Sequence, residues 1–148
     1  YNVIPQTAAL AGTLRTHVAS VREKVPQLVE QTVAGITQAH GADYDIRWTR
    51  GYTIGNNDVE ASRIAREVIE RQLGKETVLE MPAPMFGGED FSFYLEKVPG
   101  CFLFIGSGNE NLGAVYGVHN PKFKLDEDAM RIGLKLHLGF IQYLLMAE

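Results

Sequence analysis

The pattern of apolar residues along the chain predicts three long helices. Apolar side chains recur at intervals of three or four residues over 18–40 and 57–74, which is the spacing of an amphipathic helix, and a third helix is expected over 126–146. Pro26 lies in the first of these ranges, so we expect it either to kink that helix or to lie in its first turn. The last range is apolar nearly all round, and a helix of that kind is expected to be deeply packed.

Capping residues give the expected ends of these helices. Gly41 and Gly74 follow the first two apolar patterns, and glycine at such a position commonly ends a helix. Asn57 is the predicted N-cap of the second helix, with Glu60 three residues on in capping-box position. A further, shorter helix is expected from Glu89 to about residue 97.

The remaining apolar segments predict strands. Residues 7–16 and 43–51 alternate apolar with small or polar side chains, as half-buried strands do. Residues 77–80 and 114–118 are short strand candidates, and 101–106 is a continuous apolar run typical of an interior strand.

The order of these elements predicts two domains. Strand, helix and strand within the first fifty residues make a small sheet with a helix on one side, and 53–56 has the composition of a domain crossing. We therefore divide the chain into domains 1–52 and 53–148. A length of 148 residues suits one domain, or one small domain plus part of another, and the first residue is Tyr1 rather than methionine. We expect a fragment of a longer protein.

Composition narrows the range of functions. A net charge of −4 without a run of Lys or Arg argues against nucleic-acid binding. The single cysteine, Cys101, rules out an internal disulfide and a cysteine-based zinc cluster, and its apolar surroundings predict a buried, inert thiol. The longest apolar stretch, 138–146, is far shorter than the roughly 20 residues that span a bilayer, so we expect no membrane partner. No signal peptide is recognisable, and we expect a cytoplasmic protein.

Of the four histidines, His119 is the best placed for chemistry. His17 and His40 lie at the ends of predicted elements, where a surface role is expected, and His137 lies in the apolar last helix. His119 lies between the predicted strand 114–118 and Asn120-Pro121. The residues alone slightly favour a structural histidine over a ligand, because a metal site needs three or four ligands and the local spacing supplies no others.

Two further candidates leave similar alternatives. Glu89 and Asp90 suit the first turn of a helix on electrostatic grounds alone, although Gly87-Gly88 before them favours a loop that faces a ligand. Arg15 on its predicted strand is either an ordinary exposed charge or, if buried, a bidentate receptor for a carboxylate.

Several spaced motifs together resemble one enzyme family. The chain resembles the M20 metallopeptidases, and most closely their amidohydrolase branch, which includes hippurate hydrolases and N-acyl-amino-acid amidohydrolases. The resemblance covers essentially the whole chain. The motifs that carry it are Asn2-Val3-Ile4-Pro5, Gly12-Thr13-Leu14-Arg15-Thr16, Gly87-Gly88-Glu89-Asp90-Phe91, His119-Asn120-Pro121-Lys122-Phe123 and Asp126-Glu127-Asp128-Ala129.

The resemblance implies a fold and a chemistry. Residues 1–52 would be the second half of an α+β lid domain that also forms a homodimer, and 53–148 the C-terminal part of an α/β catalytic domain. The activity would be hydrolysis of N-acyl amino acids by water that two divalent metal ions (Zn, Mn, Co or Ni) activate. The resemblance makes His119 a metal ligand, assigns the substrate carboxylate to Asn2 and Arg15, and lines the substrate pocket with Gly87, Gly88 and Glu89.

The chain departs from the family pattern in one large respect. The family's Cys/His-rich ligand segment, its bridging carboxylate and its paired-glutamate general base have no counterpart in this sequence. We therefore assign no catalytic residue here and expect the chain alone to be inactive. Two alternatives stay open: a non-catalytic binding or dimerisation module of the same fold, and a parent enzyme that is a dipeptidase or carboxypeptidase.

Overall fold

The computed structural model of the protein describes residues 2–146, which form two compact units. One unit runs to Ile54 and includes the separate segment Ala83–Glu89. The other comprises Gly55–Pro82 and the residues from Asp90 onward.

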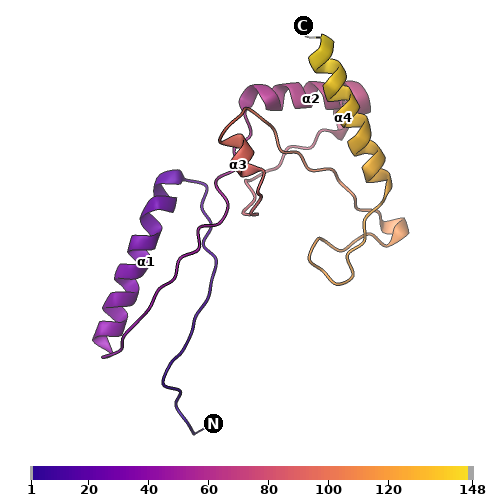
Figure 1. Cartoon of the computed structure of the whole chain (residues 1–148). Helices are drawn as coiled ribbons and strands as arrows, with labels where there is room; N and C mark the ends of the chain where they lie inside the picture. The colour runs from indigo at the N-terminus through magenta and orange to yellow at the C-terminus, as the bar shows by residue number, and fades with distance from the viewer. Residues whose placement is uncertain (1, 147–148) are drawn as a thin grey trace. The chain divides into compact units, whose positions relative to one another are not determined.

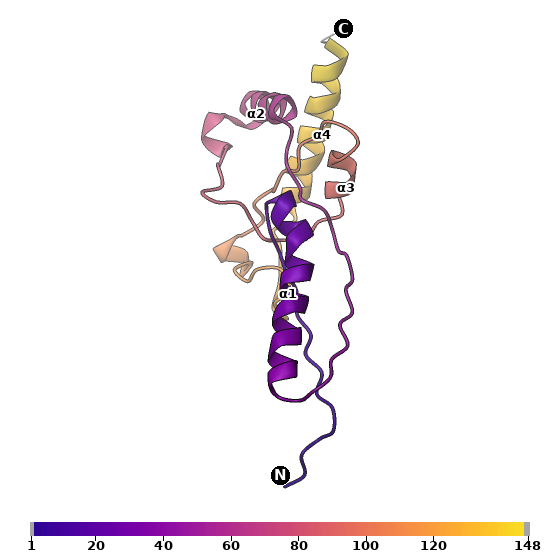
Figure 2. The ribbon, with the colours of Figure 1, turned by 90° about the vertical axis from the view of Figure 1, so that its left-hand side faces the viewer.

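The first unit is built around helix α1, Ala19–Ala39, and two extended segments run beside the helix, one before it and one after it (Figure 1). Figure 2 shows the same arrangement from another side. The Arg22 guanidinium donates hydrogen bonds to the carbonyl oxygens of Gly51 and Tyr52, at 3.2 and 3.1 Å, and so fastens the returning segment to the helix. The predicted end at Gly41 is confirmed by its φ of 63° just beyond the helix. Pro26 lies inside the helix, beyond its first turn.

The predicted strands are absent from residues 2–146. Segments 7–16, 43–51, 77–80, 101–106 and 114–118 have extended or irregular backbone without a ladder, and one isolated bridge joins Asn109 to Ala114. A strand needs a neighbour to pair its N–H and C=O groups, and within the described chain these segments find none. Leu10 is fully exposed, at 101%. The prediction of an α/β fold is therefore not confirmed, because the described elements are helices.

The second unit is organised by two helices that cross, α2 (Val59–Leu73) and α4 (Asp128–Met146) (Figure 1). Ala65 and Val68 of α2 and Leu136 of α4 are among its few buried apolar residues. Gly139 is buried at the contact, where a Cβ would lie 3.0 Å from the Val68 Cγ1 atom. The absence of a side chain at Gly139 thus lets the two helices approach closely.

Three short helices complete the second unit. They are the 3-10 helix η1 (Lys75–Thr77), the α-helix α3 (Ser92–Leu95) and the 3-10 helix η2 (Glu110–Leu112). Helix α3 is shorter than the predicted Glu89–Lys97 helix, and Glu89 belongs to the first unit.

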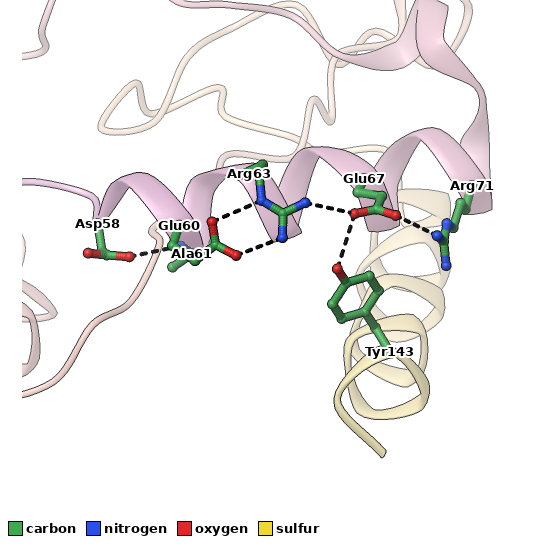
Figure 3. Close-up of polar contacts among 7 residues, drawn as sticks. All are labelled: Asp58, Glu60, Ala61, Arg63, Glu67, Arg71 and Tyr143. Carbon is green, nitrogen blue, oxygen red and sulfur yellow. Dashed lines mark hydrogen bonds and ion pairs between the residues drawn. The ribbon is translucent and has the colours of Figure 1, made fainter. Parts of the chain in front are cut away.

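The start of α2 corrects the predicted cap. Asp58 is the N-cap, and its Oδ1 accepts a hydrogen bond of 2.8 Å from the Ala61 N–H (Figure 3). The Asn57 amide instead pairs with the backbone of Phe102, donating to its carbonyl at 3.0 Å and accepting from its N–H at 2.8 Å. The sequence prediction chose the wrong member of an Asn-Asp pair because either residue can cap. The predicted end at Gly74 is confirmed.

Helix α4 is not deeply packed. One side lies toward the interior of its unit, and the opposite side is an exposed apolar stripe at helical spacing, Met130, Leu134, Leu138, Ile141 and Leu145, each at least half exposed. The prediction of deep packing was wrong for the described chain because no other described element covers this stripe. Cys101 is half-buried rather than buried. Within residues 2–146, no helix has the length and apolarity to cross a bilayer.

Candidate functional site

His119 is held in a strained turn at the surface of the second unit. Its φ is 70°, in the left-handed region that side chains other than glycine rarely adopt. The turn is closed by the Asn120 N–H, which donates to the Gly117 carbonyl at 3.2 Å. A second turn follows at once, because the Asn120 side chain accepts from the Lys122 N–H at 2.8 Å. Backbone strain of this kind is concentrated at functional sites, where the surrounding structure maintains it.

The His119 turn alone does not make a metal site. Its imidazole is exposed, and among the residues that the structure describes no three His, Cys, Asp or Glu side chains gather into a group able to hold an ion. A metal centre needs three or four protein ligands. The described residues therefore do not fit a complete metal site, and His119 supplies one donor at most.

The other predicted site residues fall in the first unit. Asn2 and Arg15 are exposed, and so are Gly87, Gly88 and Glu89. The exposure of Arg15 corresponds to the first of its two alternatives, an ordinary exposed charge. His119 belongs to the second unit, so each unit carries part of the predicted set.

The loop with the glycine pair is anchored by aromatic contacts inside the first unit. The Phe86 ring lies against the His17 imidazole, with 4.1 Å between ring centroids and 50° between the planes. A Cβ on Gly88 would lie 2.8 Å from the Tyr52 Cδ2 atom. The sequence predicted that a ligand or another backbone segment comes close to this glycine pair. The structure shows that an aromatic side chain makes the close approach.

Sequence reasoning assigned His17 to the surface and did not single out Tyr52. Both contacts join residues far apart in the chain, which hydrophobic periodicity does not reveal. One signal in the sequence could have indicated an aromatic anchor for the loop: Phe86 directly precedes a glycine pair, and the pair has no side chain of its own to hold the loop.

Electrostatic shifts in the second unit belong to structural contacts. The Asn109 amide donates to the Asp126 carboxylate at 2.7 Å, and this hydrogen bond, helped by the Asp128 N–H, lowers the Asp126 pKa. The Arg63 guanidinium donates to Glu60, which lowers the pKa of Glu60 and raises that of Arg63.

These contacts of Arg63 continue along α2 (Figure 3). Arg63 also pairs with Glu67, Glu67 accepts from Arg71, and the Tyr143 hydroxyl of α4 donates to Glu67 at 3.1 Å. This chain of ion pairs lies on the exposed side of α2 and ties it to α4.

Comparison with known proteins identifies the family. The model of peptidase family M20/M25/M40 matches residues 3–143, nearly the whole chain. The chain belongs to this family. The resemblance that its motifs carry is thereby confirmed.

Relatives of this M20 chain include hydrolases of several kinds. It is 35% identical over 140 residues to the putative amidohydrolase YhaA of Bacillus subtilis, covering 94% of this chain and 35% of that protein. It is 36% identical over 133 residues to N-acetylcysteine deacetylase of Bacillus subtilis, covering 89% and 33%. It is 34% identical over 137 residues to thermostable carboxypeptidase 2 of Saccharolobus solfataricus, covering 92% and 34%.

The M20 chain thus spans about a third of the length of the curated relatives it matches. No solved structure matches it.

Proposed function

We propose that this chain is the C-terminal part of an M20 amidohydrolase that cleaves the amide bond of N-acyl amino acids. The observation that carries the proposal is the family match over residues 3–143, with an amidohydrolase and a deacetylase among the relatives. Residues 1–52 would form half of the lid, and 53–148 the C-terminal part of the catalytic domain. Homodimerisation through the lid and a cytoplasmic location stay predictions.

Each candidate residue has a proposed role. His119 would supply a ring nitrogen to one of two divalent ions, and its turn has a positive φ, a strain often found at functional sites. The chemistry that such ions would supply is a lower pKa for a bound water and polarisation of the substrate carbonyl. Asn2 and Arg15 bind the substrate carboxylate, a role that rests on the family motifs around them, and both residues are exposed and so accessible to a ligand. Gly87, Gly88 and Glu89 line the pocket.

The same proposal makes the chain alone inactive. The described residues form no metal-binding group, so the other ligands and the general base would come from the remaining part of the longer hydrolase. That part would also cover the apolar stripe of α4. Its existence is supported by the length of the relatives, of which this chain spans about a third.

The experiment is His119→Ala in the longer hydrolase, with N-acetyl amino acids as substrates. We expect a loss of hydrolysis of at least about 100-fold and a lower content of bound metal, because removing a ligand costs more than removing one of its supporting contacts, which itself costs 10–100-fold. His40→Ala is the matched control, since His40 is also exposed but lies at the end of α1 in the first unit. Unchanged activity and metal content in His119→Ala would overturn the proposal.

A second candidate function is cleavage of peptides by the same site. The similarity to thermostable carboxypeptidase 2 favours it. The two functions differ in the group on the substrate nitrogen, which is a simple acyl group in one and an amino acid in the other. Comparing kcat/KM of the longer hydrolase for N-acetyl amino acids and for dipeptides separates them, and a preference for dipeptides would replace the first proposal.

A further inference from the structure

The segment Ala83–Glu89 returns to the first unit, although it follows the residues of α2 in the chain. Its residues are exposed, and it has no helix or strand of its own. Its centre is a glycine pair without side chains. What fixes its position therefore has to come from neighbouring side chains in the loop and from the residues they contact.

The contact that meets this need is the ring pair of Phe86 and His17. Their centroids are 4.1 Å apart with a tilt of 50°, so the two rings are in direct contact. Phe86 is 58% exposed, so one side of the pair is accessible. A ring contact at the surface has little other packing to support it and can be tested by single substitutions.

The two ends of this contact lie next to the two groups of proposed substrate residues. Phe86 directly precedes Gly87, and His17 follows Arg15 by two residues. The ring pair therefore joins the segment proposed to bind the substrate carboxylate to the loop proposed to line the pocket. Tyr52, against which Gly88 packs, is a second support for the loop.

We propose that His17 is a positioning residue for substrate binding, which acts by holding Phe86 and with it the Gly87-Gly88-Glu89 loop beside the Arg15 segment. This inference rests on the proposed function for the substrate and on the ring geometry for the contact. It predicts an effect on KM rather than on kcat, because the pair lies next to binding residues and donates nothing to the reacting atoms.

The first test uses the 148-residue chain and needs no activity. Nuclear Overhauser effects between the His17 and Phe86 ring protons are expected by NMR. In His17→Ala the backbone order parameters of Gly87 and Gly88 should fall from rigid values toward about 0.6. His17→Phe keeps a ring and should retain them, and His40→Ala should change nothing. Absent ring contacts, or an equally ordered loop in His17→Ala, would overturn the inference.

The second test measures KM and kcat of the longer hydrolase with an N-acetyl amino acid. His17→Ala and Phe86→Ala should each raise KM about 3- to 10-fold, the size expected of a ring pair, with kcat within about 2-fold. His17→Phe should restore KM. The double variant should be no worse than either single one, because both remove the same contact. Effects that multiply in the double variant, or an unchanged KM in His17→Ala, would refute the role of His17.

The two proposals fail in distinguishable ways. If His119→Ala and Arg15→Lys leave hydrolysis unchanged, the proposed function is wrong, and with it the role of His17 toward substrate, whatever the ring contact does in NMR. If those two variants lose activity while His17→Ala keeps its KM, the proposed function stands and His17 has no positioning role.

Discussion

Helices α2 and α4 pack against each other, yet their other sides differ in chemistry. The exposed side of α2 carries alternating charges, Glu60, Arg63, Glu67 and Arg71, that pair along the helix and contact α4 through Tyr143, at the edge of the packed side. The outer side of α4 carries the apolar stripe, opposite the side that packs within its unit. A helix with one apolar face suits the surface of a domain, whereas a helix with two opposite apolar faces suits a position between two layers.

The difference indicates which side of the second unit suits contact with water and which side suits contact with further protein. Ion pairs between exposed groups add little stability, but they keep a helix face compatible with water. Exposed leucines scattered singly are ordinary, whereas a contiguous stripe marks an interaction surface. The α4 stripe is thus the side where the proposed longer hydrolase would continue.

The sharpest test of this comparison is a pair of leucines two residues apart on α4. Leu136 is 5% exposed and Leu138 is 53% exposed. Leu136→Ala should lower the free energy of unfolding by about 2–5 kcal/mol, because it removes a buried side chain and leaves a cavity. Leu138→Ala should change it by no more than about 0.5 kcal/mol. Urea unfolding of the chain followed by circular dichroism measures both, and equal losses would contradict the two-sided description of α4.

A smaller loss is expected at Gly139, where α4 contacts side chains of α2. Gly139→Leu places a side chain where even a Cβ would lie 3.0 Å from Val68 and Gln72 atoms. Overpacking of this kind should cost about 1–3 kcal/mol of unfolding free energy. Gly35→Leu in α1 is the matched control, because no atom from outside its own helical turn lies within 4 Å of its added Cβ. Denaturant unfolding of both variants decides the point, and a Gly139→Leu chain as stable as the Gly35→Leu chain would show that the helices do not touch there.

The next effect concerns the cap of α2. Asp58→Ala removes the acceptor for the Ala61 N–H and should cost about 1 kcal/mol. Asp58→Asn keeps an oxygen acceptor at the same place and should cost much less. Thermal unfolding monitored at a helix band compares the two variants. Losses of the same size would mean that charge at the helix N-terminus, and not the hydrogen bond, is what Asp58 provides.

The helices were predictable from the sequence because their determinants are local. The apolar residues that define each helix, and the glycines at 41 and 74, lie within or directly beside the helix that they determine. Both predicted helix ends are confirmed. The strands were not formed because a strand is defined by its neighbour. The run 101–106 has the composition of an interior strand, and the described chain offers it no partner.

The candidate site was predictable to a different degree. The motifs around Arg15, Gly87 and His119 sufficed to recognise the family, which comparison confirms. The motifs did not reveal that His17 contacts Phe86, because a contact between distant segments leaves no periodic signal. Nor does the sequence foretell the positive φ of His119, since the same residues fit an ordinary strand exit.

The smallest effect we expect is a pH dependence of the unfolding free energy that comes from the start of α4. A hydrogen-bonded carboxylate lies there, and paired carboxylates also lie on α2. Asp126 accepts from the Asn109 side chain and from the Asp128 N–H, and these hydrogen bonds lower its pKa below the usual value near 3.8. Because the folded-state pKa is depressed, Asp126 contributes stability that is fully present above its unfolded-state pKa. That contribution is lost as the pH falls below about 4 and through the folded-state pKa.

Asp126→Asn removes this titration while keeping an oxygen that can accept one hydrogen bond. The difference in unfolding free energy between the natural chain and Asp126→Asn should be largest near neutral pH and should shrink below about pH 4. Other carboxylates titrate in both proteins, so the difference between the two curves isolates Asp126. A difference that stays constant down to about pH 3 would mean that the two hydrogen bonds do not favour the charged carboxylate. The link between Asn109 and the start of α4 would then depend on shape alone.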